Sequence, residues 1–126
     1  RAGTKTAFNT GSTDDDLARA AWFRGTAGLG SKEEGTHLVG KKEPNAFGLY
    51  DMHGNVAEWC QDTYEEYPAA AVVDPKGPAH GFGRVARGGS WVKDAGSCRS
   101  ANREWFRSAD RFGQLGFRIV SGIQQR

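Results

Sequence analysis

A chain of 126 residues, 37% hydrophobic and 25% charged, has the composition of one globular domain and excludes a disordered tail. The net charge of +2 is spread along the sequence with the bases mainly in the last third, so a nucleic acid would have to bind one end, and electrostatics alone selects no partner. We expect no nucleic-acid partner. We also expect no membrane insertion, because no apolar run is long enough to span a bilayer and the first residues lack the apolar core of a signal peptide. Since the sequence begins without methionine, it does not define a cellular location.

Glycine shapes the expected fold. The chain has 18 glycines and four prolines, and this glycine content is about twice the usual roughly 7%. The glycines follow no repeat, so they predict turns and irregular loops and disfavour a bundle of long helices.

Few regular elements are expected, and they are short. A helix is predicted over residues 15–23, because aspartates precede its apolar residues and acids favour a helix N-terminus. Residues 25–42 lack periodicity, which predicts a surface loop that carries His37. Short strands are predicted over residues 47–50, 56–59, 83–86 and 117–120, and a proline- and glycine-containing turn over residues 74–78.

The two cysteines, Cys60 and Cys98, are too few for a disulfide scaffold. One bridge and two buried thiols both remain open as interpretations. Ser90 follows a strand that runs into a Gly-Gly turn, and no Gly-x-Ser-x-Gly elbow surrounds it, so we expect a turn hydroxyl. The chain also lacks the glycine patterns that bind phosphates.

A possible cation site lies where two acidic residues bracket a Gly-Asn turn. The pattern Asp51-x-x-Gly54-x-Val56-x-Glu58 offers carboxylates and backbone carbonyls, and Ca²⁺ takes about six to eight oxygen ligands. Alternatively, the two acids cap the turn and pair with arginines such as Arg87 or Arg118. His53 beside the turn has no second histidine or cysteine at zinc spacing, so no transition metal is predicted.

An arginine-rich stretch over residues 98–111 also contains Trp105 and Phe106, and this composition can hold carboxylates, phosphates or stacked rings. We expect Arg99 and Arg103 to form internal salt bridges. The candidate acidic partners are Asp51, Glu58, Asp62 and Asp110.

Four segments closely resemble the formylglycine-generating enzyme, or sulfatase-modifying factor, superfamily. They are Asn45-Ala-Phe-Gly-Leu-Tyr-Asp-Met-His-Gly-Asn-Val-Ala-Glu-Trp59, Arg84-Val-Ala-Arg-Gly-Gly-Ser-Trp91, Arg99-Ser-Ala-Asn-Arg103 and Leu115-Gly-Phe-Arg118. The resemblance covers residues 1–120, as the C-terminal part of a family domain, and leaves residues 121–126 as a tail. It implies an α+β fold related to C-type lectins, irregular and loop-rich, with short strands and few helices.

The resemblance also implies one structural Ca²⁺ ion. In family enzymes the residues that match Asp51, Gly54, Val56 and Glu58 bind calcium, two through side chains and two through backbone carbonyls. The family's other calcium segment has no match between residues 22 and 40.

Catalysis is where the chain departs from the family. The enzymes oxidise a cysteine of a sulfatase to formylglycine with copper held by two cysteines after the Gly-Gly-Ser turn. Here Lys93 stands at the first cysteine position, and Cys98 falls nearer a family tyrosine than the second cysteine. Copper is therefore not expected, because one thiolate cannot reproduce a two-thiolate site, and Cys98 is only a weak catalytic candidate. Ala57 also replaces a family tryptophan near the substrate groove.

We therefore predict a non-catalytic, calcium-stabilised module that binds a peptide, protein or glycan. By resemblance to lectin-like relatives, the expected contact residues are Trp91, Lys93, Asp94, Glu104, Trp105, Phe106, Arg107, Phe112 and Gln114. A second expected partner is the N-terminal half of the domain, in the same or another chain, because a half-domain exposes apolar surface that the other half covers.

Two alternative functions remain. One is a copper-dependent formylglycine-generating oxidase, and the other is a retroelement-diversified lectin-like protein. The second is disfavoured, because adenine mutagenesis of Asn codons that end in a pyrimidine cannot produce Lys93, Glu104, Trp105 or Gln114.

Overall fold

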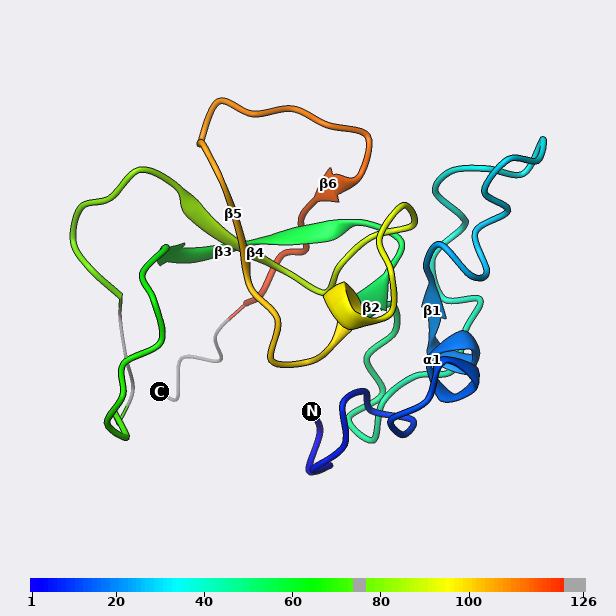
Figure 1. Cartoon of the computed structure of the whole chain (residues 1–126), viewed down its shortest axis with the longest axis horizontal. Coiled ribbons are helices and arrows are strands. Elements are labelled where there is room, and N and C mark those ends of the chain that lie inside the picture. The colour runs from blue at the N-terminus through cyan, green and yellow to red at the C-terminus, as the bar shows by residue number, and fades with distance from the viewer. Residues whose placement is uncertain (74–76, 122–126) are drawn as a thin grey trace.

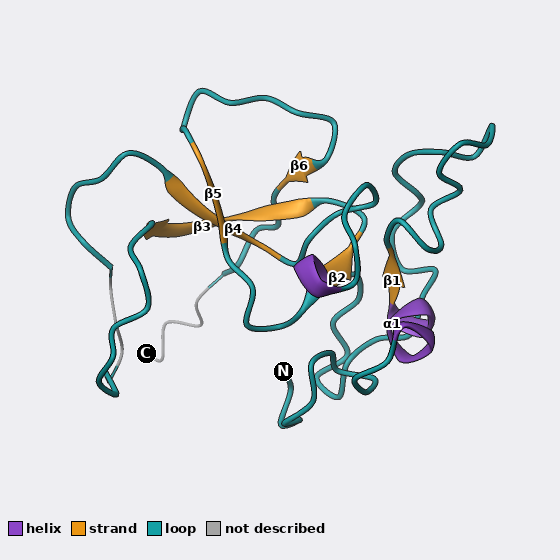
Figure 2. Cartoon of the chain, in the orientation of Figure 1, coloured by secondary structure: helices purple, strands orange, loops and turns teal. Residues whose placement is uncertain are grey.

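A computed structural model describes residues 1–73 and 77–121 of the chain. Two regions lie next to each other: an N-terminal region with one helix and a small sheet, and a larger sheet formed by the second half of the chain (Figure 1). Most of the remaining chain is loop and turn (Figure 2). The predicted irregular α+β fold, loop-rich with short strands and few helices, is thereby confirmed. In the described part, no helix has the length and apolar character to cross a membrane.

A capping box fixes the start of helix α1, which spans Asp14–Ala20. Thr13 Oγ1 accepts a hydrogen bond from the Asp16 N–H at 3.2 Å, and the Asp16 carboxylate accepts one from the Thr13 N–H at 3.1 Å. Hydrogen bonds to the carboxylate, first that from the Thr13 backbone, lower the pKa of Asp16 to about 2. The helix therefore begins one residue before the predicted start.

The helix also ends earlier than predicted, because the next residues enter a sheet. Strand β1, Ala21–Trp22, pairs in parallel with β2, His53–Gly54. At Gly54 the backbone has φ 69°, and a Cβ there would lie 2.2 Å from the carbonyl oxygen of Trp22. Only glycine fits this approach of the two strands.

The larger sheet has the strand order β5-β4-β3-β6. Its strands are β3 (Ala57–Thr63), β4 (Arg84–Arg87), β5 (Glu104–Phe106) and β6 (Leu115–Gly116). The β3–β4 and β4–β5 pairs are antiparallel, whereas β6 runs parallel to β3. The strands predicted over residues 56–59 and 83–86 correspond to β3 and β4, although β3 continues to Thr63 past a register irregularity.

Two predicted strands are wrong. Residues 47–50 lie in a turn, because Asn45 Oδ1 accepts hydrogen bonds from the N–H groups of Phe47 at 2.9 Å and Leu49 at 3.1 Å. Residues 117–120 form no strand, since the chain leaves the ladder after Gly116 and Arg118 folds onto the Tyr50 carbonyl at 3.1 Å. The turn predicted over residues 74–78 lies mainly outside the described residues.

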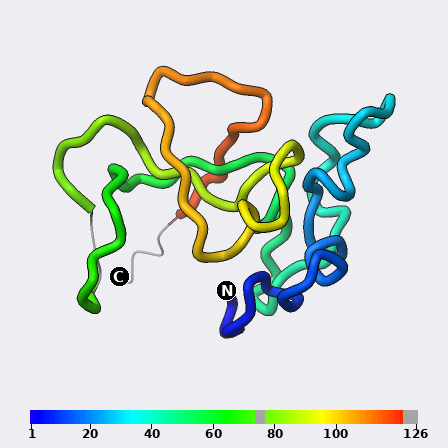
Figure 3. The backbone as a smooth tube through the Cα atoms, viewed as in Figure 1, coloured from blue at the N-terminus to red at the C-terminus, as the bar shows by residue number. Residues whose placement is uncertain are grey.

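The loop predicted over residues 25–42 is present. Figure 3 follows this part of the chain away from β1 and back to α1, where the Glu43 N–H donates to the Arg19 carbonyl at 2.9 Å. His37 is half-buried and stacks on Trp22 with 3.9 Å between ring centroids. His37 therefore anchors the loop to β1 and is not a freely solvated side chain.

The main core cluster contains Phe8, Leu17, Ala21, Phe23 and Cys98. Both cysteines are free thiols, so the disulfide interpretation is wrong. Cys98 is buried, as the alternative of two buried thiols predicts, whereas Cys60 on β3 is only half-buried.

Candidate functional site

The segment between β2 and β3 brings the predicted acidic residues to one cavity. Asp51, Val56 and Glu58 are among the residues that line a cavity of about 530 Å³. Gly54 is buried in β2 and does not line it. The structure thus places three of the predicted calcium ligands around one space and the fourth beside it.

Arg118 holds this segment in place. Its Nε and Nη2 donate to the two carboxylate oxygens of Glu58 at 2.5 and 2.6 Å, and its guanidinium also donates to the carbonyls of Tyr50 and Asp51. These bonds to Glu58 raise the pKa of Arg118. Of the two predicted arginine partners, Arg118 is present, whereas Arg87 donates to the Ser100 carbonyl.

One oxygen in this segment is of the kind that a hard cation binds. Asp51 Oδ2 accepts a hydrogen bond from the Gly40 N–H at 2.7 Å, but its Oδ1 is buried without a hydrogen-bond partner among the described residues. A buried carboxylate oxygen that lacks a donor is costly unless a cation or water binds it. Residues 1–73 and 77–121 contain no group of three or more His, Cys, Asp or Glu side chains suited to a metal. Backbone carbonyls would therefore have to complete a calcium shell.

The thiols present do not fit the copper site that the family resemblance implies. Lys93, at the first cysteine position, forms an ion pair with Glu104, with 3.1 Å between Nζ and Oε2. Cys98 has no exposed surface, and burial raises the pKa of its thiol to about 12. Burial also raises the pKa of Cys60. Neither cysteine therefore presents a reactive thiolate near neutral pH.

His53 and Ser90 do not supply an alternative catalytic pair. His53 Nδ1 lies 2.8 Å from the Cys98 carbonyl, and its Nε2 accepts a hydrogen bond from the Asn9 N–H at 3.2 Å. Burial lowers the pKa of His53, so the neutral ring is favoured. The Ser90 hydroxyl is buried and has no hydrogen-bond partner within the described part of the chain. Among the described residues, therefore, no base is hydrogen-bonded to Ser90, as its activation would require.

Several predicted contact residues support local structure. Asp94 Oδ1 accepts a hydrogen bond from the Ser97 N–H at 2.8 Å, which holds the 3₁₀ helix η1, Gly96–Cys98, and lowers the pKa of Asp94. The Gln114 carbonyl accepts from the Ala57 N–H at 2.8 Å, and the Trp91 N–H donates to the Asn55 carbonyl at 2.9 Å.

The predicted contacts on β5 point to two faces of the sheet, because side chains alternate along a strand. Trp105 is half-exposed and packs near Tyr64, with 6.4 Å between ring centroids. Phe106 lies 6.0 Å from Trp59 and 5.9 Å from Phe112 between ring centroids. Arg107 is exposed next to this strand. The predicted residues therefore do not form one patch.

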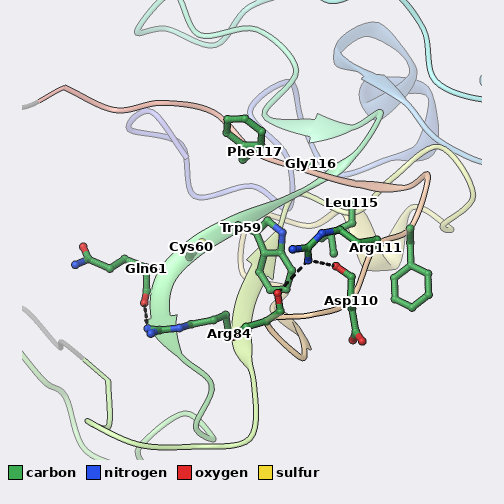
Figure 4. Close-up of a pocket in the computed structure, with 11 residues that line it drawn as sticks. Trp59, Cys60, Gln61, Arg84, Asp110, Arg111, Leu115, Gly116 and Phe117 are labelled. Carbon is green, nitrogen blue, oxygen red and sulfur yellow. Dashed lines mark hydrogen bonds between the residues drawn. The ribbon is translucent and has the colours of Figure 1, made fainter.

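Beside Phe106 and Phe112 lies a larger cavity, of about 750 Å³, that we did not predict. Its lining residues come from β3, β4, β6 and the segment before and after β6 (Figure 4). The apolar lining side chains are Trp59, Phe112, Leu115 and Phe117, and the charged ones are Arg84, Asp110 and Arg111. Ala57 and Trp59 are two residues apart on β3, a spacing that puts apolar side chains on one face of a strand and could have indicated the β3 wall of the cavity. The parallel pairing of β6 with β3, which forms the other wall, was not visible in the sequence.

The predicted salt bridges of Arg99 and Arg103 are wrong. Arg99 Nε donates to the Gly96 carbonyl at 2.9 Å, and Arg103 Nη2 donates to the Glu65 carbonyl at 2.6 Å. The Arg103 guanidinium also lies 3.7 Å over the Tyr67 ring. The expected acids have other partners, since Glu58 binds Arg118 and Asp110 accepts from the Arg107 N–H.

The irregular α+β fold, with its Gly-Gly turn after β4 and its Glu58–Arg118 pair, defines the class of protein. Residues 1–123 match the family described as the sulfatase-modifying factor enzyme 1-like domain. The chain belongs to this family, and the resemblance found in the sequence is confirmed.

Two curated relatives illustrate the breadth of the family. The chain is 43% identical over 92 residues to the serine/threonine-protein kinase pkn1 of Chlamydia pneumoniae. The matched segment covers 70% of this chain and 15% of the kinase. It is 38% identical over 91 residues to the formylglycine-generating enzyme of Streptomyces coelicolor, and the matched segment covers 68% of this chain and 29% of the enzyme.

Solved structures agree in fold. Treponema denticola variable protein 1 matches with a TM-score of 0.84 and 39% identity over 92% of this chain and 41% of that protein. PvdO from Pseudomonas aeruginosa matches with a TM-score of 0.76 and 31% identity over 93% of this chain and 46% of that protein. The chain thus spans less than half the length of these relatives.

Proposed function

We propose that the chain is a non-catalytic binding module of the sulfatase-modifying factor family, with a calcium-stabilised scaffold and a peptide, protein or glycan ligand. One observation carries the non-catalytic part. The ammonium group of Lys93 occupies the first copper-cysteine position in an ion pair with Glu104, and Cys98 is a buried thiol with a raised pKa. The side chains present do not supply two accessible thiolates.

The large cavity and its aromatic walls support a binding role. Phe112, one of the predicted contact residues, lines the cavity together with Trp59, and Phe106, another, packs against both rings from outside the lining. Ligand pockets commonly combine an apolar lining with a few polar groups at their edges. Trp105, on the other face of β5, is a separate exposed aromatic contact in this proposal.

Calcium would stabilise the segment that joins the two sheets. The buried, unpartnered Oδ1 of Asp51 supports a cation there, since ligation would satisfy an otherwise unpaired atom. Glu58 would share its carboxylate between the cation and Arg118, because each carboxylate oxygen has more than one acceptor direction. We assign this ion a structural role only.

The second partner in the proposal is the remaining part of the family domain, in the same or another chain. Five large apolar side chains in the segments next to Gly40, Tyr50 and Arg118 are between 73% and 87% exposed: Leu38, Val39, Phe47, Ile119 and Val120. Apolar surface of this kind marks an interface. The solved relatives, which this chain covers to 41% and 46%, contain additional chain able to cover it.

The alternative function is that of a formylglycine-generating oxidase, the activity in the name of the relative from Streptomyces coelicolor. The purified chain is incubated with copper, oxygen and a cysteine-containing peptide, and aldehyde formation is followed by mass spectrometry. We expect the peptide cysteine to remain unchanged, whereas the Streptomyces enzyme serves as the positive control. Robust turnover that is lost on Cys98→Ser would overturn the binding-module proposal and locate the chemistry at Cys98.

A further inference from the structure

We propose that the cavity beside β3 and β6 binds a peptide carboxylate next to an apolar or aromatic side chain, with Arg111 as the carboxylate contact. The inference rests on the proposed binding function and adds the chemical class of ligand. Three observations support it: an open apolar wall, two guanidinium groups without acidic partners among the described residues, and backbone hydrogen bonds that orient those groups.

The apolar wall is large and only partly covered. Phe112 is 48% exposed and Phe117 is 73% exposed, and both line the cavity together with Trp59 and Leu115. Burial of such side chains contributes roughly 25 cal/mol for each Å² of apolar surface removed from water. The volume of about 750 Å³ admits an aromatic amino-acid side chain and its backbone.

Two cationic groups flank this wall. Arg111 Nη1 donates to the carbonyls of Ser108 at 3.0 Å and Asp110 at 2.7 Å, and Arg84 Nη1 donates to the Gln61 carbonyl at 2.5 Å (Figure 4). Neither arginine forms a salt bridge with any acid in the described residues. The Nε and Nη2 donors of both side chains therefore remain available to a ligand.

The positions of the guanidinium groups assign them different roles. Arg111 and Trp59 both line the cavity and come close together in the view of Figure 4, whereas the Arg84 guanidinium is bonded to the Gln61 carbonyl. Arg111 can therefore bind a carboxylate while Trp59 contacts the attached apolar group, and Arg84 adds positive charge at longer range. Asp110 is the acidic lining residue, and its Oδ2 accepts a hydrogen bond from the Arg107 N–H at 2.9 Å.

Anchoring of both arginines favours a charged ligand over a neutral sugar. Their backbone hydrogen bonds fix the side chains before a ligand arrives, so less conformational entropy is lost on binding. A neutral sugar would form only neutral-acceptor hydrogen bonds with these guanidinium groups, whereas a carboxylate forms salt-bridged, charge-assisted hydrogen bonds, which are the stronger kind. A peptide carboxylate also brings the apolar side chain that the wall requires.

The test uses small probes and the whole chain. N-acetyl-phenylalanine, its neutral amide and a methyl glucoside are each titrated into the ¹⁵N-labelled protein, and amide chemical shifts are followed by NMR. We expect the acid to shift the amides of Leu115, Gly116 and Phe117, and the neutral amide to bind about tenfold more weakly, as for a lost charge-assisted hydrogen bond.

Three variants and one matched control assign the contacts. Arg111→Gln is expected to weaken the acid about tenfold, and Arg84→Gln to weaken it less. Phe117→Ala removes an exposed ring, so the fold is expected to persist while affinity falls. Arg99→Gln, at an exposed arginine that does not line the cavity, should leave binding unchanged.

Three outcomes would overturn the assignment: equal binding of the acid and the amide, shifts that map away from β6, or shifts caused by the glucoside alone. These outcomes differ from failure of the proposed function. Turnover in the copper assay would overturn the non-catalytic module whatever binds here, whereas no turnover and no shifts would overturn only the carboxylate site.

Discussion

At the scale of single residues, Cys98 combines close packing with a thiol that stays protonated. A Cβ added at Gly89, whose φ is 69°, would lie 2.5 Å from Cys98 Sγ. The Cys98 carbonyl lies 2.8 Å from His53 Nδ1, and its side chain belongs to the core cluster. Cys98 was a weak catalytic candidate in the sequence, and these contacts show that it packs in the core of the fold.

Alkaline pH should destabilise the protein through Cys98. Burial raises the thiol pKa from 9.0 to about 12, so the unfolded chain releases this proton at a lower pH than the folded chain. The contribution to stability is therefore complete below pH 9.0 and decreases between pH 9.0 and about 12, by at most about 1.4 kcal/mol for each pH unit. Urea unfolding across this range measures the effect.

The control for this prediction is Cys98→Ala, which removes the titrating group. The variant loses packing at every pH, so only the slope of stability against pH is compared. The difference between the wild-type and variant slopes isolates the contribution of the thiol from that of all other groups. Parallel slopes would contradict a buried, protonated Cys98.

At the scale of elements, the sequence predicts what is local and misses what depends on distant partners. Strands β3 and β4 could be predicted because their apolar residues are bounded by turn residues. Strands β1 and β6 have two residues each, too few to show an alternating pattern, and they exist because Ala21 pairs with His53 and Leu115 with Ala57. Residues 47–50 had strand-like composition, but the Asn45 side chain turns the backbone there.

The same distinction applies to the candidate sites. Asp51 and Glu58 are close in sequence, so their common cavity could be predicted from spacing and from the family resemblance. The larger cavity forms only when β6 pairs with β3 in the observed register. This pairing brings Phe117 and Arg111 to the same cavity as Trp59. No local pattern encodes that register, so the cavity became visible only in the fold.

Calcium should stabilise the segment that joins β2 to β3. We expect a higher calorimetric unfolding temperature with Ca²⁺ than with a chelator, because the ion would bind the unpartnered Asp51 Oδ1 only in the folded chain. At a Ca²⁺ concentration about 100 times the Kd, the gain is about 2.7 kcal/mol. Asp51→Asn and Glu58→Gln should each reduce this gain.

Glu58→Gln also weakens the pair with Arg118, so that variant is less stable with or without the ion. The informative quantity is therefore the difference between the Ca²⁺ and chelator measurements within each variant. Asp15→Asn, on the exposed first turn of α1, is the matched control and should keep the full difference. If the wild-type protein unfolds at the same temperature in both conditions, the calcium proposal fails.

At the scale of the whole molecule, apolar side chains from separate parts of the chain surround one polar cluster. The Gly40 N–H donates to Asp51 at 2.7 Å, which places the preceding Leu38 and Val39 near that cluster. Arg118 donates to the Tyr50 carbonyl at 3.1 Å, which brings the following Ile119 and Val120 to the same region. We call these four exposed residues the apolar face.

The apolar face should make the isolated chain self-associate. Contact between such faces removes apolar surface from water, worth roughly 25 cal/mol per Å², wherever the proposed partner, the remaining part of the family domain, does not cover them. Sedimentation velocity over a range of protein concentrations should show reversible association, and the combined variant Val39→Ser, Ile119→Ser and Val120→Ser should sediment as a monomer.

Val73→Ser, at a valine 91% exposed outside this face, is the matched control and should associate like the wild type. A wild-type chain that stays monomeric at every concentration would argue against an uncovered interface, whereas association unchanged in the combined variant would assign the contact to another surface.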